Sequence, residues 1–102
     1  MKIRHRPPAV RILLDEERLR CWLATAKAGE ILEYHRGVLV IDRLPGGGRL
    51  AERDRRELDR VADAVFRIAS ANRGYLVQRR HGDGDYSYLF VQKAPAFPLD
   101  AS

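Results

Sequence analysis

The sequence predicts a small α+β domain whose elements follow the order helix, strand, helix, strand, strand. Three observations predict it. Two stretches repeat apolar residues at helical spacing, a strand-like stretch lies between them, and two strand-like runs near the C-terminus flank a loop rich in Gly and Asp. A chain of 102 residues suits one domain with a modest core. We expect a flexible basic arm over residues 1–11, a single folded domain over 12–93 and a mobile tail over 94–102.

The first helix is expected to begin after Asp15, because an Asp side chain accepts hydrogen bonds from the free N–H groups of a helix start. Gly29 is a natural stop for the same helix. The residues at i, i+3, i+4 and i+7 spacing predict its buried side: Leu19, Trp22, Leu23 and Ala26.

Residues 30–42 are rich in β-branched and aromatic residues and predict strand structure, which Gly37 interrupts. Two arrangements are open: one long strand with a bulge at Gly37, or two short strands that turn at Arg36 and Gly37. Arg-Gly is not a favoured hairpin pair, so one bent strand is the preferred interpretation.

Residues 44–49 contain three consecutive glycines and predict a linking loop, without the pattern of a phosphate-binding loop. No Gly or Pro occurs from Leu50 to Asn72, which predicts a second helix, either continuous or broken near residues 55–57. Gly74 is expected to cap its end. The buried side is predicted from helical spacing: Leu58, Val61, Ala62, Val65, Ile68, Ala69 and Asn72.

Residues 75–80 and 86–93 predict the two strands of a C-terminal hairpin, joined by a five-residue loop over 81–85. An isolated hairpin is barely stable in water, so this one needs the helices to pack against.

Composition excludes several classes of protein. No apolar run approaches the roughly 20 residues that a membrane helix needs, and the N-terminus lacks the apolar centre of a secretory signal. Cys21 is the only cysteine, so no intrachain disulfide forms. We therefore expect a cytoplasmic protein. The histidines and the cysteine lack metal-ligand spacing and no nucleophile motif is present, so we expect neither a cofactor, a metal nor an enzyme.

The net charge of +5 is unevenly distributed. Residues 1–11 hold four basic residues and no acid, and residues 49–93 hold ten basic and seven acidic residues. This pattern fits a protein that binds an anionic partner, and it also fits an ordinary arginine-rich soluble protein.

The order of elements resembles the winged-helix domain, a helix-turn-helix variant with a C-terminal hairpin. Three stretches are also similar to small proteins encoded by bacterial prophages: residues 29–37, 76–80 and 86–89. The winged-helix resemblance implies that the helix before the hairpin enters the major groove of DNA while the wing touches phosphates. The sequence departs from the family in having no distinct turn before that helix, and in carrying Asp83 and Asp85 in the wing loop.

We expect a nucleic-acid-binding regulator that uses three groups of basic residues. These are the helix face with Arg53, Arg56, Arg60 and Arg67, the hairpin with Arg79, Arg80 and His81, and the arm with Lys2, Arg4 and Arg6. The plainer interpretation of the helix face is a solvated surface with ion pairs such as Arg53–Glu57 and Asp63–Arg67. A homodimer would fit a regulator that reads two half-sites.

The alternative is a protein-binding module, such as a phage-encoded inhibitor of a host defence or transcription complex. It would use the mixed-charge helix face, or it would add a partner strand at the edge of the hairpin. Acids among the arginines favour this alternative, and the basic arm favours DNA.

Overall fold

The computed structural model describes residues 9–11, 15–46 and 49–93, and the fold is α+β as predicted. The basic arm with Lys2, Arg4 and Arg6 and the tail over 94–102 lie outside the described residues. Two short elements, β1 and α2, are additional to the predicted order. The elements are β1 (Val10–Arg11), α1 (Glu16–Thr25), β2 (Ile31–Gly37), α2 (Leu39–Asp42), α3 (Glu52–Ser70), β3 (Gly74–Gly82) and β4 (Asp85–Gln92).

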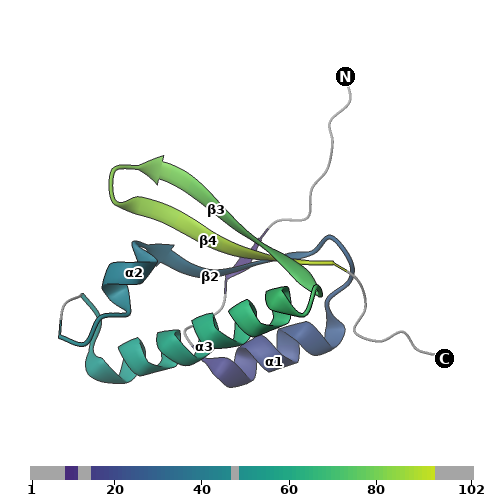
Figure 1. The fold of residues 1–102 in the computed structure, drawn as a ribbon, viewed down its shortest axis with the longest axis horizontal. Helices are drawn as coiled ribbons and strands as arrows, with labels where there is room; N and C mark the ends of the chain where they lie inside the picture. The colour runs from purple at the N-terminus through teal and green to yellow at the C-terminus, as the bar shows by residue number, and fades with distance from the viewer. Residues whose placement is uncertain (1–8, 12–14, 47–48, 94–102) are drawn as a thin grey trace.

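The strands form one sheet in the order β1-β2-β4-β3. β4 pairs antiparallel with both β2 and β3, while the short β1 runs parallel to β2, with Val10 opposite Leu32. The helices α1 and α3 lie side by side on one face of the sheet (Figure 1). The β3–β4 hairpin rises away from these helices, above α2. The sheet therefore has two different edges, a two-residue strand at one side and a nine-residue strand at the other.

The core lies between this sheet and the two long helices. Phe90 of β4 is fully buried, and the ring of Trp22 meets it edge-on with centroids 6.1 Å apart. Both predicted helical stripes contribute, although Trp22 and Leu23 are only half-buried. The largest fully buried side chains are Phe90, Leu19, Leu32, Leu58, Val61 and Val65.

The predicted start of α1 is confirmed. The Asp15 carboxylate accepts hydrogen bonds from the backbone N–H groups of Glu17 at 2.8 Å and Arg18 at 3.3 Å. The helix ends at Thr25, and Gly29 has φ +90° in the turn that leads to β2. Local capping chemistry thus sets the position of α1.

Both predicted arrangements of residues 30–42 are wrong. β2 ends at Gly37, its irregularity lies between Glu33 and His35, and the residues after Gly37 form the helix α2. The Asp42 carboxylate stabilises this helix, because it accepts a hydrogen bond from the backbone N–H of Val38 at 3.3 Å. This hydrogen bond, together with the contacts of Asp42 with His35 and Arg49, overrides the strand preference of Val and Ile.

The stretch from Leu50 to Asn72 forms the single helix α3, which ends at Ser70. The prediction that Gly74 caps it is wrong. Asn72, expected in the buried stripe, is exposed and takes the positive φ of 65° at the helix end. Gly74 is instead buried at the start of β3, where a Cβ atom would overlap the ring of Phe90.

The hairpin turn is shorter than predicted. β3 and β4 continue until Gly82 pairs with Asp85, which leaves Asp83 and Gly84 as the turn. Gly84 has φ +69°, a value that favours glycine and lets the chain reverse within two residues. Three residues of the predicted loop belong to the strands: His81, Gly82 and Asp85. His81 lies at a register shift within β3.

Candidate functional site

The arginine face of α3 lies on the exposed side of the helix, as its spacing predicted. The Arg53 side chain is 91% exposed, and carboxylates bind its neighbours. Arg56 contacts Glu52 at 3.0 Å, and Arg60 contacts Glu57 at 2.6 Å. The face therefore presents balanced charge along most of its length.

The ion pairs differ from the two predicted ones. Arg53 is 3.9 Å from Asp54, and Asp63 accepts from Arg43 at 2.8 Å. Glu52 binds both Arg55 and Arg56, and these hydrogen bonds, with that from Arg55 the larger, lower the pKa of its carboxyl to about 2. This carboxylate stays ionised at physiological pH, so Glu52 keeps its negative charge beside Arg55 and Arg56.

The basic residues of the hairpin point in different directions. Arg79 is opposite Ser87, on the face of the sheet away from the helices, and Arg80 is opposite Tyr86 on the other face. Arg80 also pairs with Asp83 of the turn. These residues do not combine with the arginines of α3 into one continuous basic surface.

A chain of hydrogen bonds joins three polar residues on the face away from the helices. The Ser87 hydroxyl donates to Glu33 Oε2 at 2.5 Å, and His81 Nε2 lies 2.7 Å from Ser87 Oγ. The serine stands between the other two groups, and its proton is directed to the carboxylate. In a catalytic triad the histidine would stand in the middle and take that proton, so the geometry is that of a structural network.

A second polar network anchors α2. His35 Nε2 lies 2.7 Å from Asp42 Oδ2, and both side chains are almost completely buried. Arg49 Nη2 contacts the same oxygen at 2.8 Å. Burial raises the pKa of the Asp42 carboxyl, but the hydrogen bonds from Arg49 and His35 outweigh it and hold the pKa below 3.8. The network ties β2, α2 and the loop after α2 together.

An apolar groove of about 850 Å³ opens between α2, α3 and the hairpin. The sequence pattern did not reveal it, because α2 was expected to be strand. Several apolar side chains on its walls are exposed, from Phe66 at 37% to Val40 at 70%. The lining residues are Tyr34, Val38, Leu39, Val40, Arg43, Leu44, Asp59, Phe66, Leu76, Val77, Gln78, Tyr86 and Tyr88.

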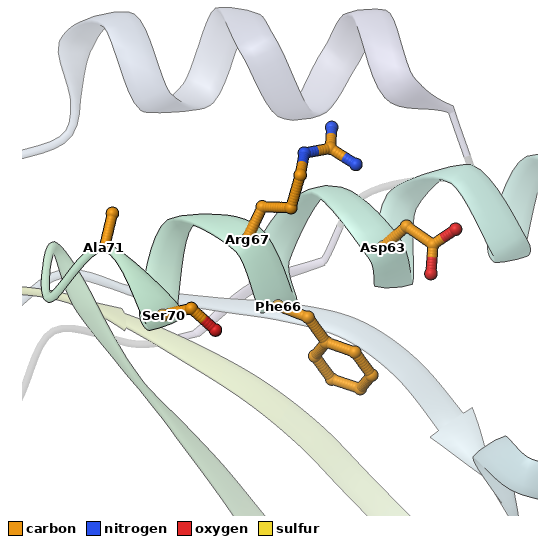
Figure 2. A pocket seen from close by; sticks show the side chains of 5 residues that line it. All are labelled: Asp63, Phe66, Arg67, Ser70 and Ala71. Atoms are coloured by element: carbon orange, nitrogen blue, oxygen red, sulfur yellow. The ribbon is translucent and has the colours of Figure 1, made fainter.

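One cation in the groove, Arg43, forms ion pairs with two carboxylates. Arg43 Nε contacts Asp59 Oδ1 at 2.6 Å, and its Nη2 contacts Asp63 Oδ1 at 2.8 Å. Its guanidinium also lies 5.8 Å from the centre of the Phe66 ring. Figure 2 shows Phe66 on the side of α3 toward the strands and Arg67 on the side toward α1. A second, open hollow on α3 is lined by the five residues labelled in Figure 2: Asp63, Phe66, Arg67, Ser70 and Ala71.

The back of the groove is held by tyrosines. The Tyr88 hydroxyl accepts a hydrogen bond from the backbone N–H of Leu39 at 3.0 Å, which ties β4 to α2. Burial, followed by the neighbouring Tyr88, raises the pKa of Tyr34 to about 12. The Tyr34 phenol therefore stays neutral at physiological pH and adds no charge to the back of the groove.

β3 forms the open edge beside the groove. The backbone N–H of Lys93 donates to the carbonyl of Arg73 at 3.2 Å. Hydrogen bonding alternates along an antiparallel pair. The backbone groups of Tyr75, Val77 and Arg79 therefore point to β4, and those of Leu76, Gln78 and Arg80 point outward. Apart from its two terminal glycines, β3 is exposed along its whole length.

Searches against family models, curated proteins and solved structures found no match to the chain. Among the described residues, no helix is long and apolar enough to cross a membrane. Within the same part of the chain, no three His, Cys, Asp or Glu side chains gather as they would around a metal ion.

Proposed function

We propose that this protein is a protein-binding module that captures an extended segment of its partner by adding it as a strand beside β3. An inhibitor of phage type, acting in the cytoplasm, would have this kind of surface. Added strands gain affinity from main-chain hydrogen bonds and specificity from pockets for alternate side chains. β3 offers outward backbone groups at three positions, and the groove offers the pocket.

One observation carries this proposal: a nine-residue edge strand exposes large apolar side chains on both of its faces. Tyr75 is 53% exposed, Leu76 40% and Val77 42%. Proteins usually shorten, cover or charge such an edge, because it attracts other chains. The charges and the bulge of β3 protect only its far end, so the apolar part remains available to a partner.

The decisive experiment compares Gln78→Pro with Gln78→Ala. Proline lacks the backbone N–H that Gln78 directs away from β4, and its ring obstructs an added strand. The pairing of β3 with β4 is kept, because the backbone groups of Gln78 do not bond to β4. Tagged wild type and both variants are used to capture partners from cell extract, followed by mass spectrometry. We expect the wild type and Gln78→Ala to retain the same protein and Gln78→Pro to lose it.

Thermal unfolding of both variants provides the control, because equal midpoints exclude a folding defect. Retention of the same protein by Gln78→Pro would rule out strand addition at this edge.

A second candidate function is nucleic-acid binding by the winged-helix-like arrangement, with α3 toward the groove of DNA. The exposure of Arg53, Arg56 and Arg60 on one side of α3 favours it. Fluorescence anisotropy with random duplex DNA across a salt series tests it, since affinity should fall steeply with salt. Arg56→Ala and Arg60→Ala should weaken binding, whereas Gln78→Pro should not. A flat signal at low salt would eliminate this candidate.

A further inference from the structure

β3 separates its charge from its apolar residues along its length. Tyr75, Leu76 and Val77 come first, and Arg79 and Arg80 follow. No acidic residue lies between positions 73 and 82. A strand laid along this edge therefore meets apolar side chains at one end and cations at the other.

Arg79 and Arg80 lie on opposite faces of the sheet, so each would stand beside a different face of such a strand. Arg79 lies on the face away from the helices and has no ion-pair partner among the described residues. Arg80 lies on the groove side and contacts Asp83, whose side chain is 98% exposed and can turn to water. Two successive residues of an added strand would each stand opposite a guanidinium.

The groove itself prefers uncharged side chains. Its cation, Arg43, already contacts both Asp59 and Asp63, so a carboxylate entering there would meet two others. Its remaining walls are largely apolar and include the exposed side chains of Val40 and Leu44. Negative charge is thus favoured beside the far end of β3 and disfavoured inside the groove.

We propose that the captured segment runs antiparallel to β3, begins with two carboxylate residues opposite Arg80 and Arg79, and continues with apolar residues on its groove side. This inference rests on the proposed strand addition. The antiparallel direction follows from the slightly greater stability of antiparallel pairing. With this direction, the residues after the two acids stand opposite Gln78, Val77 and Leu76, at the mouth of the groove.

The test uses fluorescein-labelled peptides and anisotropy titration of the full-length protein. The first peptide is Glu-Glu-Leu-Thr-Leu-Thr, and the second carries Lys-Lys in place of Glu-Glu. We expect the Glu peptide to bind about thirtyfold more tightly, because two cross-strand pairs change from attraction to repulsion. The reversed sequence, Thr-Leu-Thr-Leu-Glu-Glu, has the same composition and should bind more weakly.

The double variant Arg79→Ala/Arg80→Ala should lose most of the preference for Glu over Lys. The matched control is Arg18→Ala/Arg20→Ala, which removes the same charge from exposed positions on α1 and should keep the full preference. If both double variants lose the preference for Glu over Lys to the same extent, net charge alone attracts the peptide, and the inference is overturned.

The remaining outcomes separate this inference from the proposed function. Glu and Lys peptides that bind equally, and that both fail to bind Gln78→Pro, would refute the acidic partner and leave strand addition standing. If no peptide binds and the protein captures nothing from extract, both proposals fail. Concentration-dependent self-association that Gln78→Pro abolishes would show that a second copy occupies the edge, and would also overturn the inference.

Discussion

The two strands of the hairpin have similar residues and opposite surroundings. β4 has a strand on each side and buries Phe90, Leu89 and Gln92. β3 has one neighbouring strand, and Gly74 is its single buried residue. Aromatic and β-branched residues in β4 contribute to the core, whereas those of β3 remain in contact with water. The position of a strand in the sheet thus decides whether its apolar residues are buried in the core or exposed to solvent.

The largest expected effect tests this contrast directly. Phe90→Ala should lower the free energy of unfolding by about 3–5 kcal/mol, since it empties the centre of the core. Leu76→Ala, on the neighbouring strand, should lower it by less than about 1 kcal/mol, because Leu76 is already 40% exposed. Urea unfolding measures both variants. Similar losses would mean that β3 is as important for stability as β4.

Stability should also depend on the buried polar network that anchors α2. Asp42→Ala removes a buried carboxylate that both His35 and Arg49 contact and should cost about 3 kcal/mol, measured by urea unfolding at pH 7. Arg43→Ala, a groove residue whose carboxylate partners are partly exposed, is the comparison and should cost clearly less. If both variants lose the same stability, burial of the His35–Asp42 pair is not the cause.

The same network predicts a pH dependence. The pKa of Asp42 is lower in the folded protein than the ordinary 3.8, so its stabilisation is complete above about pH 4 and is lost as pH falls further. Asp42→Asn removes this titration. We therefore expect the wild type to lose more stability than Asp42→Asn between pH 5 and pH 3, as followed by thermal unfolding. Parallel curves for the two proteins would contradict the lowered pKa.

A smaller effect is expected where β3 enters the core. Gly74→Ala introduces a methyl group against Phe90 and should cost about 2 kcal/mol through overpacking. Gly82→Ala at the other end of β3 is the matched control, because a Cβ there meets nothing within 4 Å. Chemical denaturation measures the free energy of unfolding of both variants, and we expect a loss for Gly74→Ala alone. An unchanged free energy in Gly74→Ala would show that the Phe90 ring can move aside.

The smallest effect should come from the arginine face of α3. Arg60→Ala breaks an exposed ion pair with Glu57 and should change the unfolding free energy by less than about 0.5 kcal/mol. Thermal unfolding measures this change. A loss above 1 kcal/mol would show that this face stabilises the fold, as the buried residues of β4 do, and is not merely exposed like β3.

Sequence by itself determined the features that depend on neighbours along the chain. The cap at Asp15, the buried and exposed sides of α3 and the pairing of the C-terminal hairpin follow from local capping and periodicity. The α+β class follows from these elements. Which arginines face water was predictable for the same reason, since helical spacing places them opposite the apolar stripe.

Tertiary structure alone decided the site. Residues 39–42 became a helix because Asp42 binds His35 and Arg49, and no local pattern contains those contacts. β3 became the open edge because β2 pairs with β4 instead. Aromatic and β-branched residues occur in central and edge strands alike, so the order of residues suggested a hairpin edge but did not show which strand would form it or that a groove would lie beside it.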